Sequence, residues 1–186
     1  MAAGRGVFAL LIGNRRAAGY FDATQRGLVT SFIALVFAAA VRSFLPIIVS
    51  KDHDSALVSL VQFAILFGVQ LGCAVIVLRQ IKRMDALVPY LVADNWVTFF
   101  VTLIFGALTA AGVAGDTAGD GITIIFGIAV LVLEVNIARI VMGLAPLQIA
   151  SLVVAELVGA LLAVGIIILL FPLPPDAMAQ LSSIGQ

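Results

Sequence analysis

The chain has 186 residues, of which 63% are hydrophobic and only 11% are charged, and its mean hydropathy is +1.23. A soluble domain of this size needs more polar surface, so the composition excludes a soluble globular protein and indicates an integral membrane protein. Ten basic and ten acidic side chains cancel, which leaves no net charge to attract nucleic acid or acidic substrates. We therefore expect the lipid bilayer as its surroundings and no nucleic-acid partner.

The N-terminal segment, residues 1–26, contains the short apolar stretch "VFALLIG", which is followed by Asn14, Arg15 and Arg16. A cleaved signal peptide would carry small residues at that point. We expect the segment to be retained and to form a short interfacial helix that contains Phe8 and Leu11 and lies on the cytoplasmic face.

Five apolar runs follow that are long enough to cross a bilayer. The sequence thus predicts an all-α fold, a single transmembrane domain that is an integral membrane bundle of five helices. Because the connections are short, consecutive helices should be antiparallel neighbours, and the last two should form a tight hairpin. The predicted spans are approximately residues 27–49, 57–78, 88–113, 122–144 and 147–171.

The distribution of Lys and Arg predicts the orientation of the bundle. Basic residues precede the first span and lie between the second and third, whereas the loop between the third and fourth spans holds Asp116 and Asp120 and no base. Under the positive-inside rule, this pattern predicts a multi-pass protein of the inner (cytoplasmic) membrane with a cytoplasmic N-terminus. Residues 172–186 would then be a short tail outside.

Several polar side chains interrupt the apolar runs. An ionisable residue at membrane depth costs a few kcal/mol, so it normally faces protein or water and has a partner. At about 1.5 Å per residue, Glu134, Glu156 and Gln70 come out near mid-depth, while Asp94 and Arg139 share a level nearer the cytoplasmic boundary and could pair. The predicted intramembrane polar site consists of Arg42, Gln70, Asp94, Glu134, Arg139 and Glu156.

Two carboxyls at one depth cannot both ionise cheaply, so at least one of Glu134 and Glu156 should be protonated unless Arg42 or Arg139 reaches it. The pair could serve as a proton or cation relay, or as a polar site between helices. Alternatively, each could simply hold helices together through a hydrogen bond, which is a common use of polar residues in small bundles. Asn136 lies about 200° around the helix from Glu134 and must serve another face.

No catalytic motif and no set of metal ligands is present in the sequence. The single cysteine, Cys73, lies in an apolar run and excludes a cysteine cluster. The short loops leave little room for an extramembrane active site. We therefore expect no enzyme activity, no cofactor and no metal.

The start "LLIGNRRAAGYFDATQRGLVTSFIAL" places a basic pair and an amphipathic segment before the first of five closely spaced spans. In this arrangement the chain resembles the bacterial branch of the Yip family, the Ypt/Rab-interacting-protein type of five-span membrane protein. The Asp-Leu-Tyr-Gly-Pro type of motif of eukaryotic members is absent, so the resemblance transfers no functional residue. It implies a non-enzymatic bundle that organises membranes or supports a larger complex.

Two classes of function follow from the sequence. The first is an accessory or scaffold subunit of a membrane complex, with a membrane-protein partner or a homo-oligomer, which small size, short loops and abundant small residues favour. The second is a small transporter or permease subunit that uses the intramembrane carboxylates and arginines, whose number is high for five spans.

Overall fold

The structure is a computed structural model that describes residues 2–50, 56–112 and 117–171. All regular structure in these ranges is helical, and no strand occurs among them, which confirms the all-α fold. The elements are α1 (Ala2–Leu11), η1 (Arg15–Tyr20), α2 (Gln25–Ser50), α3 (Ala56–Gln80), η2 (Met84–Ala86), α4 (Leu87–Ala110), α5 (Thr117–Asn136), η3 (Ile137–Val141) and α6 (Pro146–Leu170).

Five of the described helices are long and apolar enough to cross a membrane, as the sequence predicts. The bounds differ from the predicted ones by one to four residues, and the differences at two ends affect the site. The third span begins at Met84, because the short 3₁₀-helix η2 leads directly into α4, and the fourth ends at Val141, in the π-helical turn η3. The predicted C-terminal tail, residues 172–186, lies outside the described residues.

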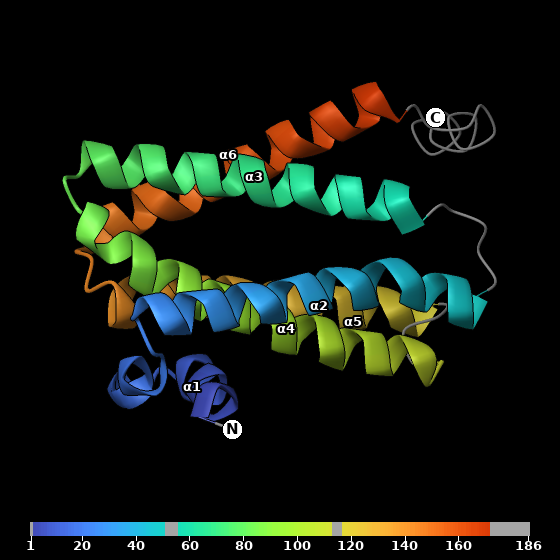
Figure 1. Ribbon diagram of the computed structural model, residues 1–186, viewed down its shortest axis with the longest axis horizontal. Coiled ribbons are helices and arrows are strands. Elements are labelled where there is room, and N and C mark those ends of the chain that lie inside the picture. The colour runs from blue at the N-terminus through green and yellow to red at the C-terminus, as the bar shows by residue number, and fades with distance from the viewer. Residues whose placement is uncertain (1, 51–55, 113–116, 172–186) are drawn as a thin grey trace.

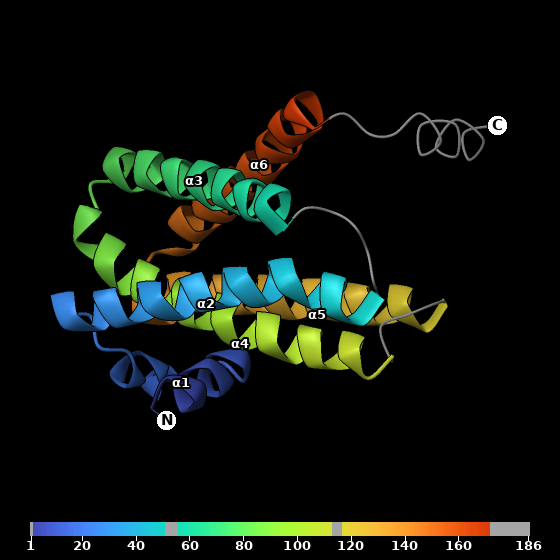
Figure 2. The same ribbon diagram turned by 45° about the vertical axis from the view of Figure 1, so that its right-hand side comes forward.

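The spanning helices form two layers (Figures 1 and 2). One layer consists of α3 and α6, which pack along each other, and the other of α2, α4 and α5, in which α2 packs chiefly against α4. The last two spans do not form the expected tight hairpin, because α6 packs chiefly against α3 and makes few contacts with α5. Chain neighbours across the short connection at Pro146 therefore belong to different layers.

Small and polar side chains explain this pairing. In the α3–α6 layer, Gly159 lies so close to Cys73 that a Cβ on the glycine would be 2.9 Å from the sulfur. In the other layer, the amide of Asn95 in α4 donates a hydrogen bond to the hydroxyl of Ser31 in α2 at 3.0 Å, and both side chains are fully buried. Close backbone approach and an interhelical hydrogen bond are the interactions that join helices in lipid, where apolar surface alone does not.

The first long helix begins at a side-chain cap. The hydroxyl of Thr24 accepts a hydrogen bond from the backbone N–H of Gly27 at 3.3 Å, while the Thr24 backbone N–H donates to the Asp22 carboxylate at 3.1 Å. Hydrogen bonds from the side chain and backbone of Thr24 lower the pKa of the Asp22 carboxyl. A side chain at position 27 would collide with the Asp22 carbonyl, so only glycine fits this turn.

The N-terminal helix α1 lies across the side of α4 and α5 at the end of the bundle where α2 begins (Figure 1). Its buried residues Gly6, Ala9 and Leu10 share one face, and its opposite face exposes Phe8. Gly13, with φ +68°, ends the helix through a bond from its N–H to the carbonyl of Leu10. This arrangement is that of an amphipathic helix at a membrane surface.

The same end of the bundle holds the connection between the last two spans. Arg83, which lies between α3 and α4, donates to the carbonyl of Met142 at 2.7 Å and to that of Gly143 at 3.4 Å, and it forms an ion pair with Asp85. These carbonyls belong to the turn after η3, where the helix leaves them without intrahelical partners. Arg83 therefore fixes the point at which the chain passes from one layer to the other.

Candidate functional site

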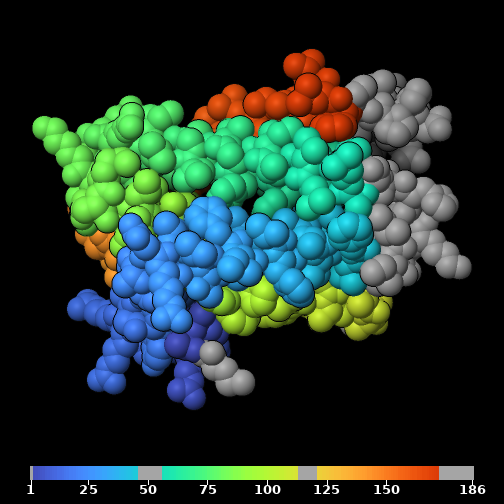
Figure 3. Space-filling view, viewed as in Figure 1, coloured from blue at the N-terminus to red at the C-terminus, as the bar shows by residue number. Residues whose placement is uncertain are grey.

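A cavity of about 380 Å³ lies between the two layers of helices. All five spanning helices contribute to its wall, and Figure 3 shows the surface hollowed between α2 and α3. Its polar lining consists of Arg42, Gln70, Tyr90, Asp94, Thr98, Thr102, Glu134 and Glu156. Most of the remaining lining is aliphatic or aromatic.

One face of α4 supplies half of these polar groups. Tyr90, Asp94, Thr98 and Thr102 follow one another at intervals of four residues, so they lie in a row along one side of the helix. The row begins at Tyr90, near the start of α4, and ends at Thr102 in its second half. This helix therefore provides a polar track along the cavity.

The carboxyl groups of Asp94 and Glu134 line the same cavity and are close enough to interact. Glu134 comes from α5, where Gly127, Val130 and Leu131 complete the same face of the helix toward the cavity. A hydrogen bond between two carboxyls needs a proton on one of them, because an ionised carboxylate is only an acceptor. A proton shared by the two side chains would therefore let them pair between α4 and α5.

Glu156 enters the cavity from the opposite layer. Its carboxyl oxygen Oε1 accepts a hydrogen bond from the Tyr90 hydroxyl at 2.8 Å, and the exposed fractions of the two residues are 8% and 5%. This bond joins α6 to α4 across the cavity. The bond gives the buried Tyr90 hydroxyl an acceptor and the Glu156 oxygen a donor, which offsets the cost of burying these polar atoms in a low-dielectric interior.

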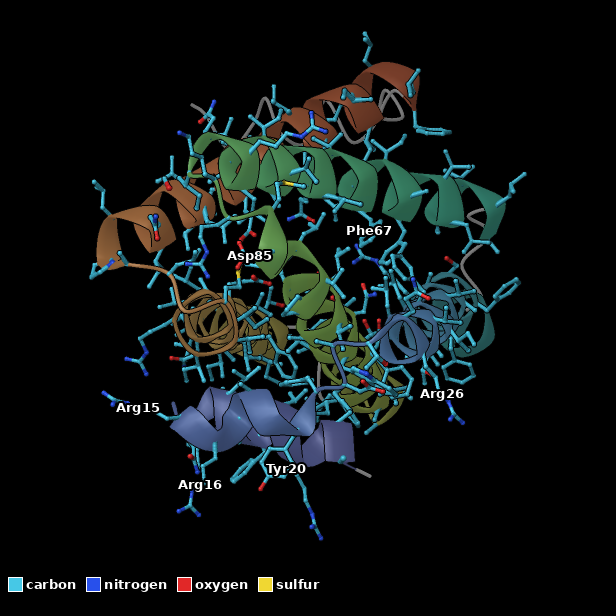
Figure 4. All side chains as sticks on the ribbon, turned by 60° about the vertical axis from the view of Figure 1, so that its left-hand side comes forward. Arg15, Arg16, Tyr20, Arg26, Phe67 and Asp85 are labelled. Carbon is cyan, nitrogen blue, oxygen red and sulfur yellow. The ribbon has the colours of Figure 1, made fainter. Side chains whose placement is uncertain are left out.

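Helix α3 contributes an aromatic wall. Phe63 and Phe67 stack on each other with ring centroids 6.5 Å apart, and both line the cavity together with Gln70. In Figure 4, Phe67 points from α3 into the space between the layers. Aromatic faces attract cations, so this wall can contact a ligand that is both positively charged and apolar.

Acidic groups dominate the charge of the cavity. Its lining contains the three carboxyls of Asp94, Glu134 and Glu156 and one base, Arg42. The only ion pair in the described residues is that of Arg83 with Asp85, so no base neutralises the three acids there. Within the described ranges, no group of three or more His, Cys, Asp or Glu residues is arranged to hold a metal ion.

The structure brings together five of the six residues that the sequence predicts for this site: Arg42, Gln70, Asp94, Glu134 and Glu156. Arg139 lies elsewhere, exposed on η3, so the expected pairing of Asp94 with Arg139 is replaced by that of Asp94 with Glu134. The reason is depth. Because the third span begins at Met84, Asp94 is about 15 Å from its start, whereas Arg139 is two residues from the end of its span.

Tyr90 is the principal residue that the sequence analysis did not assign to the site. A tyrosine near the start of a span is typical of the aromatic belt at the membrane surface. The signal that could have identified it is its spacing of four residues from Asp94, continued by Thr98 and Thr102. Asn136, by contrast, is on another face, as expected, and its amide donates to the carbonyl of Leu10 in α1 at 2.8 Å.

Comparison of the chain with protein-family models, with curated proteins and with solved structures gives no match.

Proposed function

We propose that this chain is a small membrane transporter, or the solute-binding subunit of one, that carries an organic cation or amine in exchange for a proton. The observation that supports it is the convergence of three carboxyls from three helices on one cavity between two helix layers. Drug-sized ligands occupy pockets of roughly 300 to 1,000 Å³.

Each group has a role in this proposal. The ligand's positive charge is attracted by Asp94, Glu134 and Glu156, while Phe63 and Phe67 contact its apolar part. A proton shared by Asp94 and Glu134 leaves when the cation takes its place, because both the proton and the cation neutralise the same buried charge. Binding of one therefore opposes binding of the other, which is the basis of exchange.

The direct test uses purified protein in liposomes with a pH-sensitive dye inside. External ethidium, an aromatic organic cation, should drive proton efflux through the wild-type protein. Glu134→Gln should abolish this flux, since glutamine cannot release a proton, whereas Asp85→Asn, which changes an exposed acid at the bundle's end, should leave it unchanged. A wild-type protein that moves no protons in response to ethidium, tetraethylammonium or choline would overturn the proposal.

The second candidate is the accessory or scaffold subunit, in line with the resemblance to five-span Yip-type proteins. One observation favours it: Gly68 and Gly72 of α3 have no atom near the position where a Cβ would lie, so their GxxxG face is free for a helix of another chain. Like the transporter, this accessory subunit would have no enzyme activity.

Purification in mild detergent followed by native mass spectrometry tests this second candidate. A stoichiometric membrane-protein partner should be lost from Gly68→Ile/Gly72→Ile. The partner should be retained by Gly165→Ile, which changes an equally open glycine of α6. Recovery of the wild-type chain alone would contradict the scaffold function.

Both candidates place the protein in a cell membrane, and we propose the inner (cytoplasmic) membrane. Helices α2, α4 and α6 begin, and α3 ends, at the end of the bundle that carries α1 (Figure 1). The basic residues Arg79, Lys82 and Arg83 belong to this end. Under the positive-inside rule, this end faces the cytoplasm.

A further inference from the structure

Two arginines outside the carboxyl cavity line a second hollow, near the N-terminal helix. Its volume is about 340 Å³, and its lining residues are Arg15 of η1 and Arg139 and Ile140 of the π-helical turn η3. None of these residues belongs to the carboxyl cavity. Arg139, which the sequence assigns to the intramembrane site, therefore lines a different hollow.

Two contacts bring the arginines together. The amide of Asn136 holds the carbonyl of Leu10 at 2.8 Å, which fastens the end of α1 to the start of η3. Gly13 then turns the chain toward Arg15, and a Cβ on this glycine would be 3.2 Å from Nη2 of Arg139. The left-handed turn and the absence of a side chain at position 13 leave room for the Arg139 guanidinium beside the turn.

Neither guanidinium has an acidic partner among the described residues, where the only ion pair is that of Arg83 with Asp85. Two unpaired positive charges at one hollow repel each other, and an anion bound between them removes this repulsion. The planar guanidinium presents paired N–H donors whose spacing matches the oxygens of a phosphate group. The chemistry of the hollow therefore favours a phosphate over a simple carboxylate or halide.

The surroundings of the hollow indicate how a phosphate would be presented. The adjacent helix α1 exposes the apolar side chains of Phe8 and Leu11, and Ile12 follows directly, with 61% of its surface exposed. Apolar groups of this kind insert at the boundary between headgroups and acyl chains. Basic pockets beside spanning helices at this level hold anionic lipid headgroups.

We propose that Arg15 and Arg139 bind the phosphate group of an anionic membrane lipid at the junction of α1 with the spanning bundle. The bound lipid joins the N-terminal helix to the end of the fourth span. This site is independent of transport by the carboxyl cavity, because no lining residue is shared.

The test is native mass spectrometry of the full chain released from nanodiscs that contain phosphatidylglycerol and phosphatidylcholine. The wild-type protein should retain phosphatidylglycerol in preference to phosphatidylcholine. Arg15→Gln/Arg139→Gln should lower the affinity for phosphatidylglycerol by about 30-fold, given about 1 kcal/mol for each basic residue near an anionic lipid surface. Arg16→Gln is the matched control, because Arg16 also projects from η1 (Figure 4) but does not line the hollow.

A conservative variant separates a specific site from loss of folding. Arg139→Lys keeps the charge but loses the paired donors, so it should fold like the wild type and retain phosphatidylglycerol at an intermediate level. Equal retention by the double variant and the wild type would overturn the proposal, and so would an equal loss in Arg16→Gln. Displacement of the lipid by millimolar inorganic phosphate, with tighter binding of free phosphate than of lipid, would overturn the lipid as the source.

Discussion

Asp94 and Glu134 bring two carboxyls to one cavity inside the membrane-spanning part of the protein. The cavity contains one base, Arg42, and a proton shared by the two carboxyls would offset the cost of burying two like charges side by side. We predict that infrared spectra of the protein in lipid contain a protonated carboxyl band that is lost or shifted in Glu134→Gln. Asp85→Asn, at an exposed acid, should leave the band in place. A spectrum without any band that depends on Asp94 or Glu134 would mean that both are ionised and unpaired.

The hydrogen bond between Tyr90 and Glu156 joins the two helix layers at one residue pair. Tyr90→Phe removes the donor and leaves the buried carboxyl without its partner, so we predict a loss of about 1 kcal/mol in the free energy of unfolding. Reversible unfolding in mixed micelles measures this change. Tyr20→Phe is the control, because Tyr20 is exposed on η1, and equal stability of Tyr90→Phe and the wild type would show that the bond does not join the layers in solution.

At the residue scale, the sequence identifies the buried polar groups but not all their partners. Asp94, Glu134 and Glu156 stand out because charges are expensive inside apolar runs. The partner of each group depends on its depth in the membrane, and the sequence indicates depth only through the ends of the apolar runs. The third span begins at Met84 and the fourth ends at Val141, and these shifts of a few residues place Asp94 beside Glu134 and not beside Arg139. Composition does not reveal such shifts, because the turns Met84–Ala86 and Ile137–Val141 each carry a charged side chain and still continue the spanning helix.

The N-terminal helix depends on a single side chain of the fourth span. Asn136→Ala removes the hydrogen bond to the Leu10 carbonyl at the end of α1. The lost bond should weaken the packing of α1 on the bundle by about 1 kcal/mol. The amide hydrogens of α1 should therefore exchange about five times faster than in the wild type. Hydrogen exchange followed by mass spectrometry of residues 2–11 measures this. Gln80→Ala, at an exposed amide of α3, should change nothing, and unaltered exchange in Asn136→Ala would show that other contacts hold the helix.

Packing within the α3–α6 layer depends on one glycine. A larger side chain at Gly159 must displace Cys73, whose sulfur already lies 2.9 Å from the position of a Cβ. We predict that Gly159→Leu lowers the free energy of unfolding by about 1 to 3 kcal/mol, as overpacking does. Gly165→Leu in the same helix meets open space and should have little effect. Similar stability of both variants would contradict the α3–α6 contact.

The spanning helices could be predicted from the sequence, but their partners could not. Length and hydropathy define each span because the bilayer requires about 20 apolar residues. The expected hairpin of α5 and α6 was wrong because a short connection does not decide which faces meet. Gly159 beside Cys73 and Asn95 beside Ser31 decide it instead, and the pairing of such residues becomes visible only in three dimensions.

The whole molecule is two helix layers around a polar cavity. The layers touch less along their boundary than within each layer, and the carboxyls of Asp94 and Glu134 lie on one side of the cavity while Glu156 lies on the other. Under the proposed transport function, we expect α3 and α6 to move against α2, α4 and α5, which would break the Tyr90–Glu156 bond but few contacts within either layer. Rigid-body movement of this kind around a fixed site is how many transporters provide alternating access.

The most direct test of a cation site linked to a proton is calorimetry of ethidium binding to the protein in nanodiscs. The titration is repeated at one pH in two buffers that differ in ionisation enthalpy, so that the difference in heat gives the protons released for each cation bound. We predict about one proton for the wild type and none for Glu134→Gln. Binding without proton release in the wild type, or no binding at all, would contradict a cavity in which cation and proton compete for the same carboxyls.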